Sequence, residues 1–483
     1  MSFPSKKPIK FGTDGWRGII AADFTFERVQ RVAIAAAHVL KKNYADQATS
    51  DTIIVGYDRR FLADEFALAA AEAIQGEGFT VLLANCFSPT PALSYAAHHL
   101  KGLGAIAMTA SHNPAGYLGL KVKGAFGGSV SGDITEQIEA KLAAGITPSG
   151  SITGKLDYFD PWQDYCEGLQ KLVNVELIRE AIAAGKLDVF VDVMYGAASG
   201  GLMQLLNEIV QEVHCEPDPL FGGRAPEPLE KNLSQLKRTI RSAHAENPDA
   251  IQVGFIFDGD SDRIAAMDSQ GEFLSSQKLI PILLSHLSQN RGYSGEVVKT
   301  VSGSDLIPLL SESYGLPLYE TPIGYKYIAE RMLEEKVLLG GEESGGIGYG
   351  HHIPERDALL AALYVLEAIA MADQDLGEMY QGLLDKVGFS SVYDRIDLHL
   401  KDFSIRDRLL TELKDNTPTT VAGKAVLNCD TKDGYKFRLA DQSWLLIRFS
   451  GTEPVLRLYC EAPTMADVQA TLAWAKSWAE SFE

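Results

Sequence analysis

The sequence predicts an α/β protein of four domains: three similar α/β/α domains with mixed sheets, then a C-terminal α+β domain, around a central cleft. Three observations predict this. The chain has 483 residues, too many for a single hydrophobic core. Apolar runs typical of buried strands alternate with helical patterns through most of the chain. The last hundred residues change to several alternating strands and one closing helix.

The first block shows the strand, helix and strand order most clearly. The run TIIVGYDRR at 52–60 is β-branched and apolar, and it is followed by the Ala-rich helical pattern FLADEFALAAAEAIQGEG and by the strand FTVLLAN. This order is a βαβ unit, which implies a parallel or mixed sheet covered by helices. A further apolar run, GLGAIAMTAS, places Ser111 at its carboxyl end.

The alternation of predicted strands and helices continues in the second and third blocks. Residues 186–210 predict a buried strand, a Gly-rich turn and an amphipathic helix, and residues 250–263 predict a strand that ends in acidic residues. Residues 295–315 and 317–335 predict two more strand, turn and helix units. Pro161 and Gly271 favour junctions near them. The predicted domains are 1–155, 156–270, 271–387 and 388–483.

Composition narrows the class of protein. Hydrophobic residues make up 46% and charged residues 22%, and no segment reaches the roughly 20 apolar residues of a membrane span. The first residues, MSFPSKKPIKFGTDGWRG, lack the apolar run of a signal peptide. We therefore expect a cytoplasmic protein without a membrane partner. Nothing in the sequence indicates an oligomeric state.

Net charge and cysteine content exclude two further classes. The formal charge of −20 argues against nucleic-acid binding, which normally requires a basic surface, but it allows an anionic substrate in a local pocket. The five cysteines form no CxxC pair, so the sequence predicts neither a disulfide framework nor a zinc site.

The segment FDGDSDR predicts a metal site. Asp258, Asp260 and Asp262 alternate with small residues directly after a buried strand, and their charges repel one another unless a cation lies between them. Oxygen ligands suit Mg²⁺ or Ca²⁺. An EF-hand is excluded because its sixth and twelfth positions hold Arg263 and Ser269 in this chain. The remaining alternative is a solvated acidic turn.

The segment TASHNPAGYLGLK predicts a phosphorylated serine. By itself, Ser111 followed by His112 is also typical of an ordinary turn. Lys121 is placed where a short hairpin would return its ammonium toward Ser111. Since a phosphoserine carries close to two negative charges, it needs a cation and a metal nearby. A transferable phosphoryl group on Ser111 is the interpretation that fits both segments.

Two glycine-rich turns are candidate substrate sites. LGGEESGGIGYG at 339–350 presents Glu342 and Ser344, which suit sugar hydroxyls, although a surface turn is equally compatible. RFSGTEPVLR at 448–457 combines arginines, hydroxyls and a glycine in a phosphate-binding pattern; its candidate residues are Arg448, Ser450, Gly451, Thr452 and Arg457. A Walker A sequence is absent, so a nucleoside triphosphate is not indicated.

Taken together, these segments resemble the α-D-phosphohexomutases, the phosphoglucomutase and phosphomannomutase superfamily. TASHNP is similar to the family's phosphoserine loop, DGDSDR to its metal loop, GEESG to its sugar loop and RFSGTEP to its phosphate loop, in the family's order. FGTDGWRG near the start matches as well. The resemblance covers essentially the whole chain and implies a heart-shaped protein in which each domain gives one loop to the cleft.

The resemblance also implies a role for each candidate residue. The phosphoryl group would be carried by Ser111, with Mg²⁺ held by Ser111 and the three aspartates. Lys121 would be the leading acid or base and His112 the alternative, with Arg17 and Arg263 around the transferring group. Substrate contacts would come from Gly324, Tyr325, Glu342, Ser344, Arg356, Arg448, Ser450, Gly451, Thr452 and Arg457.

The implied activity is interconversion of hexose 1-phosphate and hexose 6-phosphate, with glucose 1,6-bisphosphate as activator and hexose phosphates as the small-molecule partners. Tyr325, in TPIGYKYI, favours glucose over mannose, and the forms RFSGTEP and GEESGG disfavour glucosamine. Alternatives are net synthesis of glucose 1,6-bisphosphate from another phosphoryl donor, a catalytically silent sugar-phosphate sensor, and a phosphatase.

Overall fold

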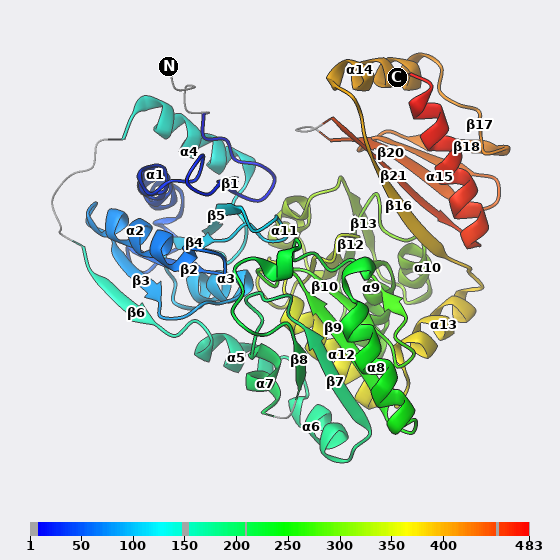
Figure 1. Cartoon of the computed structure of the whole chain (residues 1–483), viewed down its shortest axis with the longest axis horizontal. Helices are drawn as coiled ribbons and strands as arrows, with labels where there is room; N and C mark the ends of the chain where they lie inside the picture. The colour runs from blue at the N-terminus through cyan, green and yellow to red at the C-terminus, as the bar shows by residue number, and fades with distance from the viewer. Residues whose placement is uncertain (1–7, 147–153, 208–209, 451–453, 483) are drawn as a thin grey trace.

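The computed structural model describes residues 8–146, 154–207, 210–450 and 454–482. The chain forms four sheets, and Figure 1 shows them along the chain from blue to red. The predicted architecture of three α/β domains and a C-terminal α+β domain is confirmed. None of the helices in the described ranges combines the length and the apolar character that crossing a bilayer requires.

The first domain is built on a mixed six-stranded sheet with the order β1-β5-β4-β2-β3-β6. Strands β2, β3, β4 and β6 are parallel to one another. At one edge, β5 pairs antiparallel with β4, and β1 pairs antiparallel with β5. The predicted βαβ unit is present. The elements are β1 (Trp16–Ile19), α1 (Phe26–Tyr44), β2 (Thr52–Tyr57), α2 (Ala63–Gln75), β3 (Thr80–Ala84), α3 (Thr90–His99), β4 (Gly104–Met108), β5 (Tyr117–Gly124), α4 (Gly132–Ala144) and β6 (Leu156–Phe159).

The second domain has a five-stranded sheet with the order β11-β10-β9-β7-β8. Its central strand β9 is parallel to β7 and antiparallel to β10. The elements are α5 (Gln163–Gln170), α6 (Val175–Ala183), β7 (Leu187–Asp192), α7 (Gly201–Leu206), β8 (Gln211–Val213), the short 3₁₀ helices η1 (Phe221–Gly223) and η2 (Glu230–Asn232), α8 (Ser234–Glu246), β9 (Ile251–Phe257), β10 (Ile264–Met267) and β11 (Phe273–Leu274).

The third domain has a four-stranded sheet with the order β13-β12-β14-β15, in which only β15 runs antiparallel to its neighbour. The elements are α9 (Ser276–Ser285), the π-helical turn η3 (His286–Asn290), β12 (Glu296–Thr300), α10 (Leu306–Ser313), β13 (Leu318–Thr321), α11 (Tyr325–Glu334), β14 (Val337–Gly341), β15 (Ile347–Tyr349), α12 (Ala358–Ala372) and α13 (Leu376–Val387).

The fourth domain is an antiparallel six-stranded sheet with the order β16-β21-β20-β19-β18-β17. The elements are β16 (Val392–His399), α14 (Phe403–Asp415), β17 (Thr420–Val421), β18 (Lys424–Asp430), β19 (Tyr435–Leu439), β20 (Trp444–Phe449), β21 (Val455–Ala462) and α15 (Met465–Glu480). Helices α14 and α15 contribute Leu409 and Leu472 to the core of this domain.

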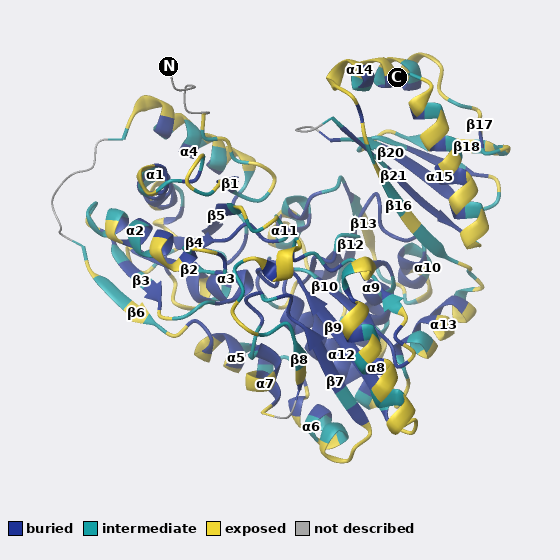
Figure 2. Ribbon diagram, viewed as in Figure 1, coloured by how far each residue is buried: buried dark blue, intermediate teal, exposed yellow. Residues whose placement is uncertain are grey.

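The core clusters show which domains are packed into one body. Domain 1 and domain 4 each have a core cluster of their own, whereas domains 2 and 3 share a single continuous cluster. Helix α12 lies in this shared core and is buried on nearly every side, as Figure 2 shows, because its sequence ALLAALYVLEAIAMA is apolar all round. The second and third domains therefore form one packed body.

Two strands lie across the predicted domain boundaries. Strand β6 comes after residue 155 yet pairs with β3 of the first sheet, and β11 comes after residue 270 yet pairs with β10 of the second. The exact boundaries stay predictions. The five cysteines are free thiols.

Candidate active site

Three of the four predicted loops begin at the carboxyl ends of sheet strands. Ser111 follows β4, Asp258 follows β9 and Glu342 follows β14. Carboxyl ends of strands are the usual binding edge of an α/β sheet. The fourth loop joins the antiparallel strands β20 and β21.

Ser111 is buried, with 1% of its surface exposed, and adopts a left-handed backbone conformation with φ of 51°. This conformation is unfavourable for a residue with a side chain and is characteristic of functional turns. The hydroxyl of Ser111 donates to Oδ2 of Asp258 at 2.7 Å, and Nδ1 of His112 lies 3.3 Å from the same hydroxyl oxygen. The structure therefore joins the predicted serine and metal loops directly.

A buried network holds the Ser111 turn in place. The hydroxyl of Thr109 donates to Asp58 at 2.6 Å and accepts from the backbone N–H of Ser111 at 2.9 Å. The guanidinium of Arg60 donates to the carbonyls of Ser111 and Asn113 at 2.5 and 2.7 Å. Asp58 is paired with Arg60 in turn, while burial raises the pKa of Asp58 to about 6.

The sequence interpretation missed Asp58 and Arg60 as parts of the site. Both stand in GYDRR, directly after a buried strand, which is the same signal that identified FDGDSDR. A charged pair at a strand end was the evidence that could have identified them.

The three aspartates of the metal loop lie fully buried, and one ligand oxygen from each lies within 4.8 Å of the others. The Oδ1 atoms of Asp260 and Asp262 are buried without a hydrogen-bond partner among the described residues. Buried unpaired carboxylate oxygens are costly, and convergent oxygens of this kind are what Mg²⁺ or Ca²⁺ binds. The residues present thus fit a divalent cation.

Lys121, on β5, reaches the metal loop. Its ammonium is 2.8 Å from oxygens of both Asp260 and Asp262 and 2.7 Å from Asp14. Although burial acts to lower the pKa of Lys121, these three carboxylates raise it above its ordinary value. The ammonium is therefore held in its charged form beside the aspartates.

The aspartates differ in their electrostatic environment. The pKa of Asp258 is raised well above its ordinary value, first by burial and then by the charges of Asp262 and Asp260. For Asp260, burial acts to raise the pKa, but Lys121 and the hydroxyl of Thr90 lower it overall. Asp258 is therefore the aspartate that bears most of the electrostatic repulsion within the cluster.

Two residues that the sequence interpretation did not assign complete the cluster. Asp14, in the FGTDGWRG segment, accepts from Arg356 at 2.6 Å as well as from Lys121. Thr90, at the start of α3, donates from its hydroxyl to Asp260 at 2.6 Å. Partners so distant in sequence carry no local signal for this role.

Arg17 and His112 contact the turn that contains Ser111, and Arg263 is close enough to act on the charge of His112. Arg17, on β1, donates to the amide oxygen of Asn113 at 2.5 Å. The charge of Arg263, then burial, then Arg17 hold the pKa of His112 well below its ordinary value. Nε of Arg263 is buried without a hydrogen-bond partner in the described part of the chain. The site is therefore cationic on the side of His112.

The predicted sugar loop lies beside this cluster. Arg356 donates to Asp262 at 2.6 Å and lies 3.9 Å from a carboxylate oxygen of Glu342. Glu342 is buried, whereas Ser344 is partly exposed in the same turn. At Gly346, a Cβ would lie 2.3 Å from the Arg356 side chain, so the loop needs glycine here to accommodate the arginine.

Tyr325 does not face the site. It is 4% exposed and packs with Val298 and Ile328 in a small core of domain 3. Arg356 lies over its ring, with 5.4 Å from the guanidinium carbon to the ring centroid. Gly324 directly precedes α11 as its N-cap residue, with φ of 136°. The sugar preference that the sequence analysis attached to Tyr325 stays a prediction, and any effect of Tyr325 would pass through Arg356.

The phosphate loop is described in part. Arg448 and Arg457 are directly opposite on β20 and β21, and Ser450 closes the end of β20 through a backbone bond to Val455. Asp433 accepts twice from Nε of Arg448, at 3.0 Å. Gly451 and Thr452 lie outside the described residues.

Domain 4 is joined to domain 3 by buried polar contacts. Glu461 accepts from the backbone N–H of Asp305 at 2.8 Å, and Lys436 donates to the carbonyl of Val301 at 2.7 Å. These contacts fix the sheet of domain 4 against domain 3.

Comparison with known proteins gives one matching family model for each of the four domains. Four models of the phosphoglucomutase/phosphomannomutase family match: alpha/beta/alpha domain I over residues 8–148, domain II over 163–271, domain III over 275–387 and the C-terminal domain over 408–473. The fold and its loops thus define a phosphohexomutase. The chain belongs to the α-D-phosphohexomutase superfamily, whose members are mutases that transfer phosphoryl groups.

Among full-length relatives, a phosphoglucomutase/phosphomannomutase of Thermococcus kodakarensis is 27% identical over 94% of each chain. A probable phosphoglucosamine mutase of Methanothermobacter thermautotrophicus is 30% identical over 95% of each chain. The crystal structure of a putative phosphomannomutase from Thermus thermophilus is similar with a TM-score of 0.83 and 33% identity, covering 99% of this chain and 100% of that one. Since these names include three sugars, similarity leaves the substrate undetermined.

Proposed function

We propose that the enzyme interconverts glucose 1-phosphate and glucose 6-phosphate through a phosphoserine at Ser111, with mannose phosphates as further substrates. The observation that carries the proposal is the Ser111 hydroxyl at 2.7 Å from Asp258, inside a buried triad with two unpartnered carboxylate oxygens. A phosphorylated serine would bring its oxygens beside that triad.

The proposed metal site consists of Asp258, Asp260, Asp262 and a phosphoryl oxygen on Ser111. A Mg²⁺ ion there would neutralise charge on the transferring group. Lys121 and Arg356 already contact the same aspartates, so the chain itself supplies two fixed cations beside the phosphoryl group. Fixed charges of this kind stabilise phosphoryl transfer without reorganising during the reaction.

In the proposed reaction, the phosphorus–oxygen bond to Ser111 breaks as a bond forms to the free hydroxyl of a hexose phosphate, giving the 1,6-bisphosphate. The hydroxyl must lose a proton and the Ser111 oxygen must gain one. His112, with Nδ1 3.3 Å from that oxygen, is placed for exchange with Ser111. Lys121 stays the predicted group for the sugar hydroxyl, although its three carboxylate partners favour its charged form.

The second half of the reaction requires the bisphosphate to turn over and return its other phosphoryl group to Ser111. Arg448 and Arg457 lie on domain 4 and suit the phosphate that is not reacting. Glu342 and Ser344 are proposed to bind the sugar hydroxyls between the two phosphate positions. Free glucose 1,6-bisphosphate would rephosphorylate Ser111 and so act as activator.

A coupled assay of glucose 1-phosphate conversion, with and without glucose 1,6-bisphosphate, tests this function. A mutase needs the bisphosphate only in catalytic amounts, whereas a bisphosphate synthase consumes a phosphoryl donor in proportion to product. A phosphatase releases inorganic phosphate, and a sensor turns nothing over. Parallel assays with mannose 1-phosphate and glucosamine 1-phosphate give the sugar preference.

Activity should rise with pH around neutrality because of Glu342. Burial raises the pKa of Glu342 to about 7, and Arg356 opposes part of this rise. As pH increases through 7 the carboxyl loses its proton and becomes a stronger acceptor for sugar hydroxyls. We expect kcat/KM at saturating Mg²⁺ to increase over this range. The Glu342→Gln variant should lose this increase and be roughly tenfold to a hundredfold less active above pH 7.

The matched control is Glu343→Gln, one residue along the loop, where the carboxylate accepts from Ser302 at 2.5 Å. It should keep the pH dependence of the parent enzyme. A Glu342→Gln enzyme with an unchanged pH profile would show that Glu342 does not control this step.

A further inference from the structure

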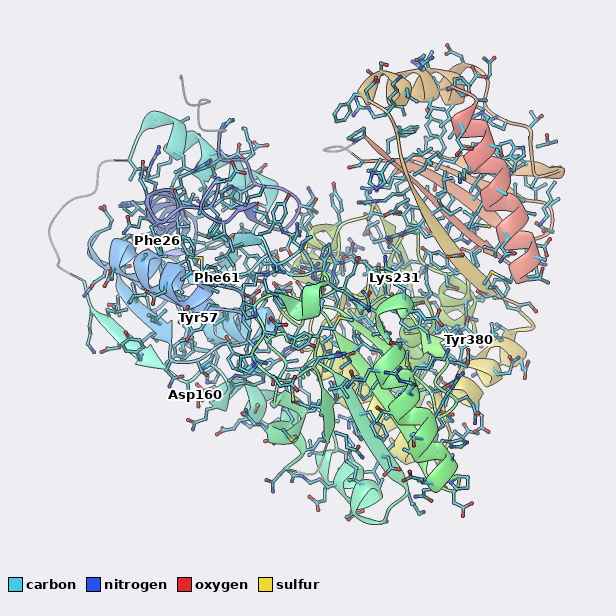
Figure 3. All side chains as sticks on the ribbon, in the orientation of Figure 1. Phe26, Tyr57, Phe61, Asp160, Lys231 and Tyr380 are labelled. Carbon is cyan, nitrogen blue, oxygen red and sulfur yellow. The ribbon has the colours of Figure 1, made fainter. Side chains whose placement is uncertain are left out.

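A cavity lies in domain 2, and none of the predicted active-site residues lines it. It has a volume of about 250 Å³ and is bounded by the segments after β7 and β8 and by the start of α8. This volume is far more than the 10–15 Å³ that one buried water needs. The lining side chains used below are Tyr195, His214, Phe221, Arg224, Pro226 and Arg238. Figure 3 labels Lys231, on the η2 segment that leads into α8.

The lining of this domain 2 cavity is cationic. Arg224 and Arg238 have no ion pair with any carboxylate in the described ranges, so their guanidinium groups stay available. The first peptide N–H groups of the 13-residue helix α8 have no side-chain cap at Leu233, and such a helix start attracts anions. Both guanidinium groups and the start of α8 belong to the lining of this one cavity.

His214 adds to the positive charge of the cavity lining. Its Nδ1 lies 3.0 and 3.1 Å from the two oxygens of Asp192, and this bond is the main cause that raises the pKa of His214. Asp192 is the only carboxylate among the lining residues, and His214 already pairs with it. Glu216 and Asp218 are close enough to act on Tyr195, but neither lines the cavity.

The walls of the cavity hold unfavourable backbone conformations. Met194, Tyr195, His214 and Phe221 line it and have φ between 47° and 58°. Side chains other than glycine rarely adopt this region, and such residues gather at ligand-binding segments. Two aromatic rings, of Tyr195 and Phe221, add apolar surface to the lining.

Two residues that line the cavity, Phe221 and Pro226, contact residues that belong to or support the phosphoserine and metal loops. The ring of Phe221 lies against the guanidinium of Arg60, 4.8 Å from carbon to centroid, and Arg60 donates to the carbonyl of Ser111. Pro226 packs on Gly259 of the metal loop: a Cβ there would lie 3.1 Å from Pro226 and 2.5 Å from the Ser111 carbonyl. A ligand in the cavity would therefore be connected to both loops through Phe221 and Pro226.

We propose that the domain 2 cavity is a second binding site for the dianion of a phosphate monoester, held by Arg224, Arg238 and the start of α8. The charge balance selects this ligand, because two guanidinium groups and a helix start match two negative charges. The two aromatic rings accommodate the organic part. Occupancy is transmitted to Ser111 through Phe221 and Arg60 and through Pro226 and Gly259.

Calorimetric titration with glucose 6-phosphate tests this proposal, using the full chain with Ser111→Ala to prevent turnover. We expect two classes of site per chain, one catalytic and one in the cavity. Adding Arg224→Gln and Arg238→Gln should weaken the second class at least tenfold and leave the first unchanged. Both arginines are exposed, so these variants should fold normally.

The control is Arg241→Gln, which removes a charge from the same helix but from an arginine paired with Glu272. It should retain both classes. A single class that persists in the double arginine variant would overturn the cavity site while leaving the proposed function intact. Two classes of site that both persist in the double arginine variant would also overturn the cavity site.

Titration with inorganic phosphate separates the two sources of the ligand chemistry. Equal affinity of phosphate and glucose 6-phosphate for the second class would assign the cavity to free phosphate. At least tenfold tighter binding of the sugar phosphate would place its organic part against Tyr195 and Phe221. In either case the binding must depend on Arg224 and Arg238 for the proposal to stand.

Discussion

The Ser111→Ala enzyme is expected to lose turnover by on the order of 10⁴-fold or more, because no other group takes the place of a lost nucleophile. Ser111 donates a single hydrogen bond through its hydroxyl, to Asp258, while its turn is held by backbone contacts from Thr109 and Arg60. The fold should therefore remain intact. The measurement is kcat in the coupled glucose 1-phosphate assay, together with the melting temperature.

Ser88→Ala is the matched control for this experiment. Ser88 is equally buried in the same domain, and its hydroxyl makes no hydrogen bond among the described residues. This variant should keep both activity and stability. Near-normal turnover of the Ser111→Ala enzyme would exclude Ser111 as the phosphoryl carrier.

The metal loop predicts a contrast between two conservative variants. Both Asp258→Asn and Asp260→Asn should weaken the Mg²⁺ dependence of activity by at least roughly tenfold, since each would remove a charged oxygen from the proposed metal site. In metal-free protein their effects on stability should be opposite. Asp258 bears the repulsion of the cluster, so its neutral amide should raise the melting temperature. Asp260 pairs with Lys121, so its loss should lower the free energy of unfolding by about 1–3 kcal/mol.

Melting temperatures in EDTA, measured at pH 8, and Mg²⁺ titrations of activity give the two readouts. The sequence alone does not distinguish the three aspartates. The contacts of Asp260 with Lys121 and Thr90 are the reason to expect relief of repulsion at Asp258 instead. If Asp258→Asn destabilised the metal-free protein as strongly as Asp260→Asn, the charge distribution derived for this cluster would be wrong.

Much of the fold could be predicted from sequence because local patterns determine it. The buried strand that ends in FDGDSDR, and the apolar run that ends at Ser111, place their polar residues at the carboxyl edges of two sheets. The change of pattern near residue 388 corresponds to the antiparallel domain that begins with β16. The sequence interpretation made no prediction for the short strands β6 and β11, which pair with β3 and β10 at sheet edges.

The parts of the site that the sequence could not supply are those that tertiary structure brings together. Asp14 meets Lys121 across more than a hundred residues, and Thr90 meets Asp260 across 170. Conversely, the sequence interpretation drew a sugar preference from Tyr325, yet the helix that it begins turns its ring into the core. Side-chain direction at a helix start depends on packing, which no short motif encodes.

The central claim is that Ser111 carries the phosphoryl group. Mass spectrometry of peptides from enzyme incubated with glucose 1,6-bisphosphate and Mg²⁺ tests it most directly. The account predicts one added phosphate on the peptide that contains Ser111, removed again when glucose 1-phosphate is supplied in excess. Phosphate on a different residue, with Ser111 unmodified, would contradict the account.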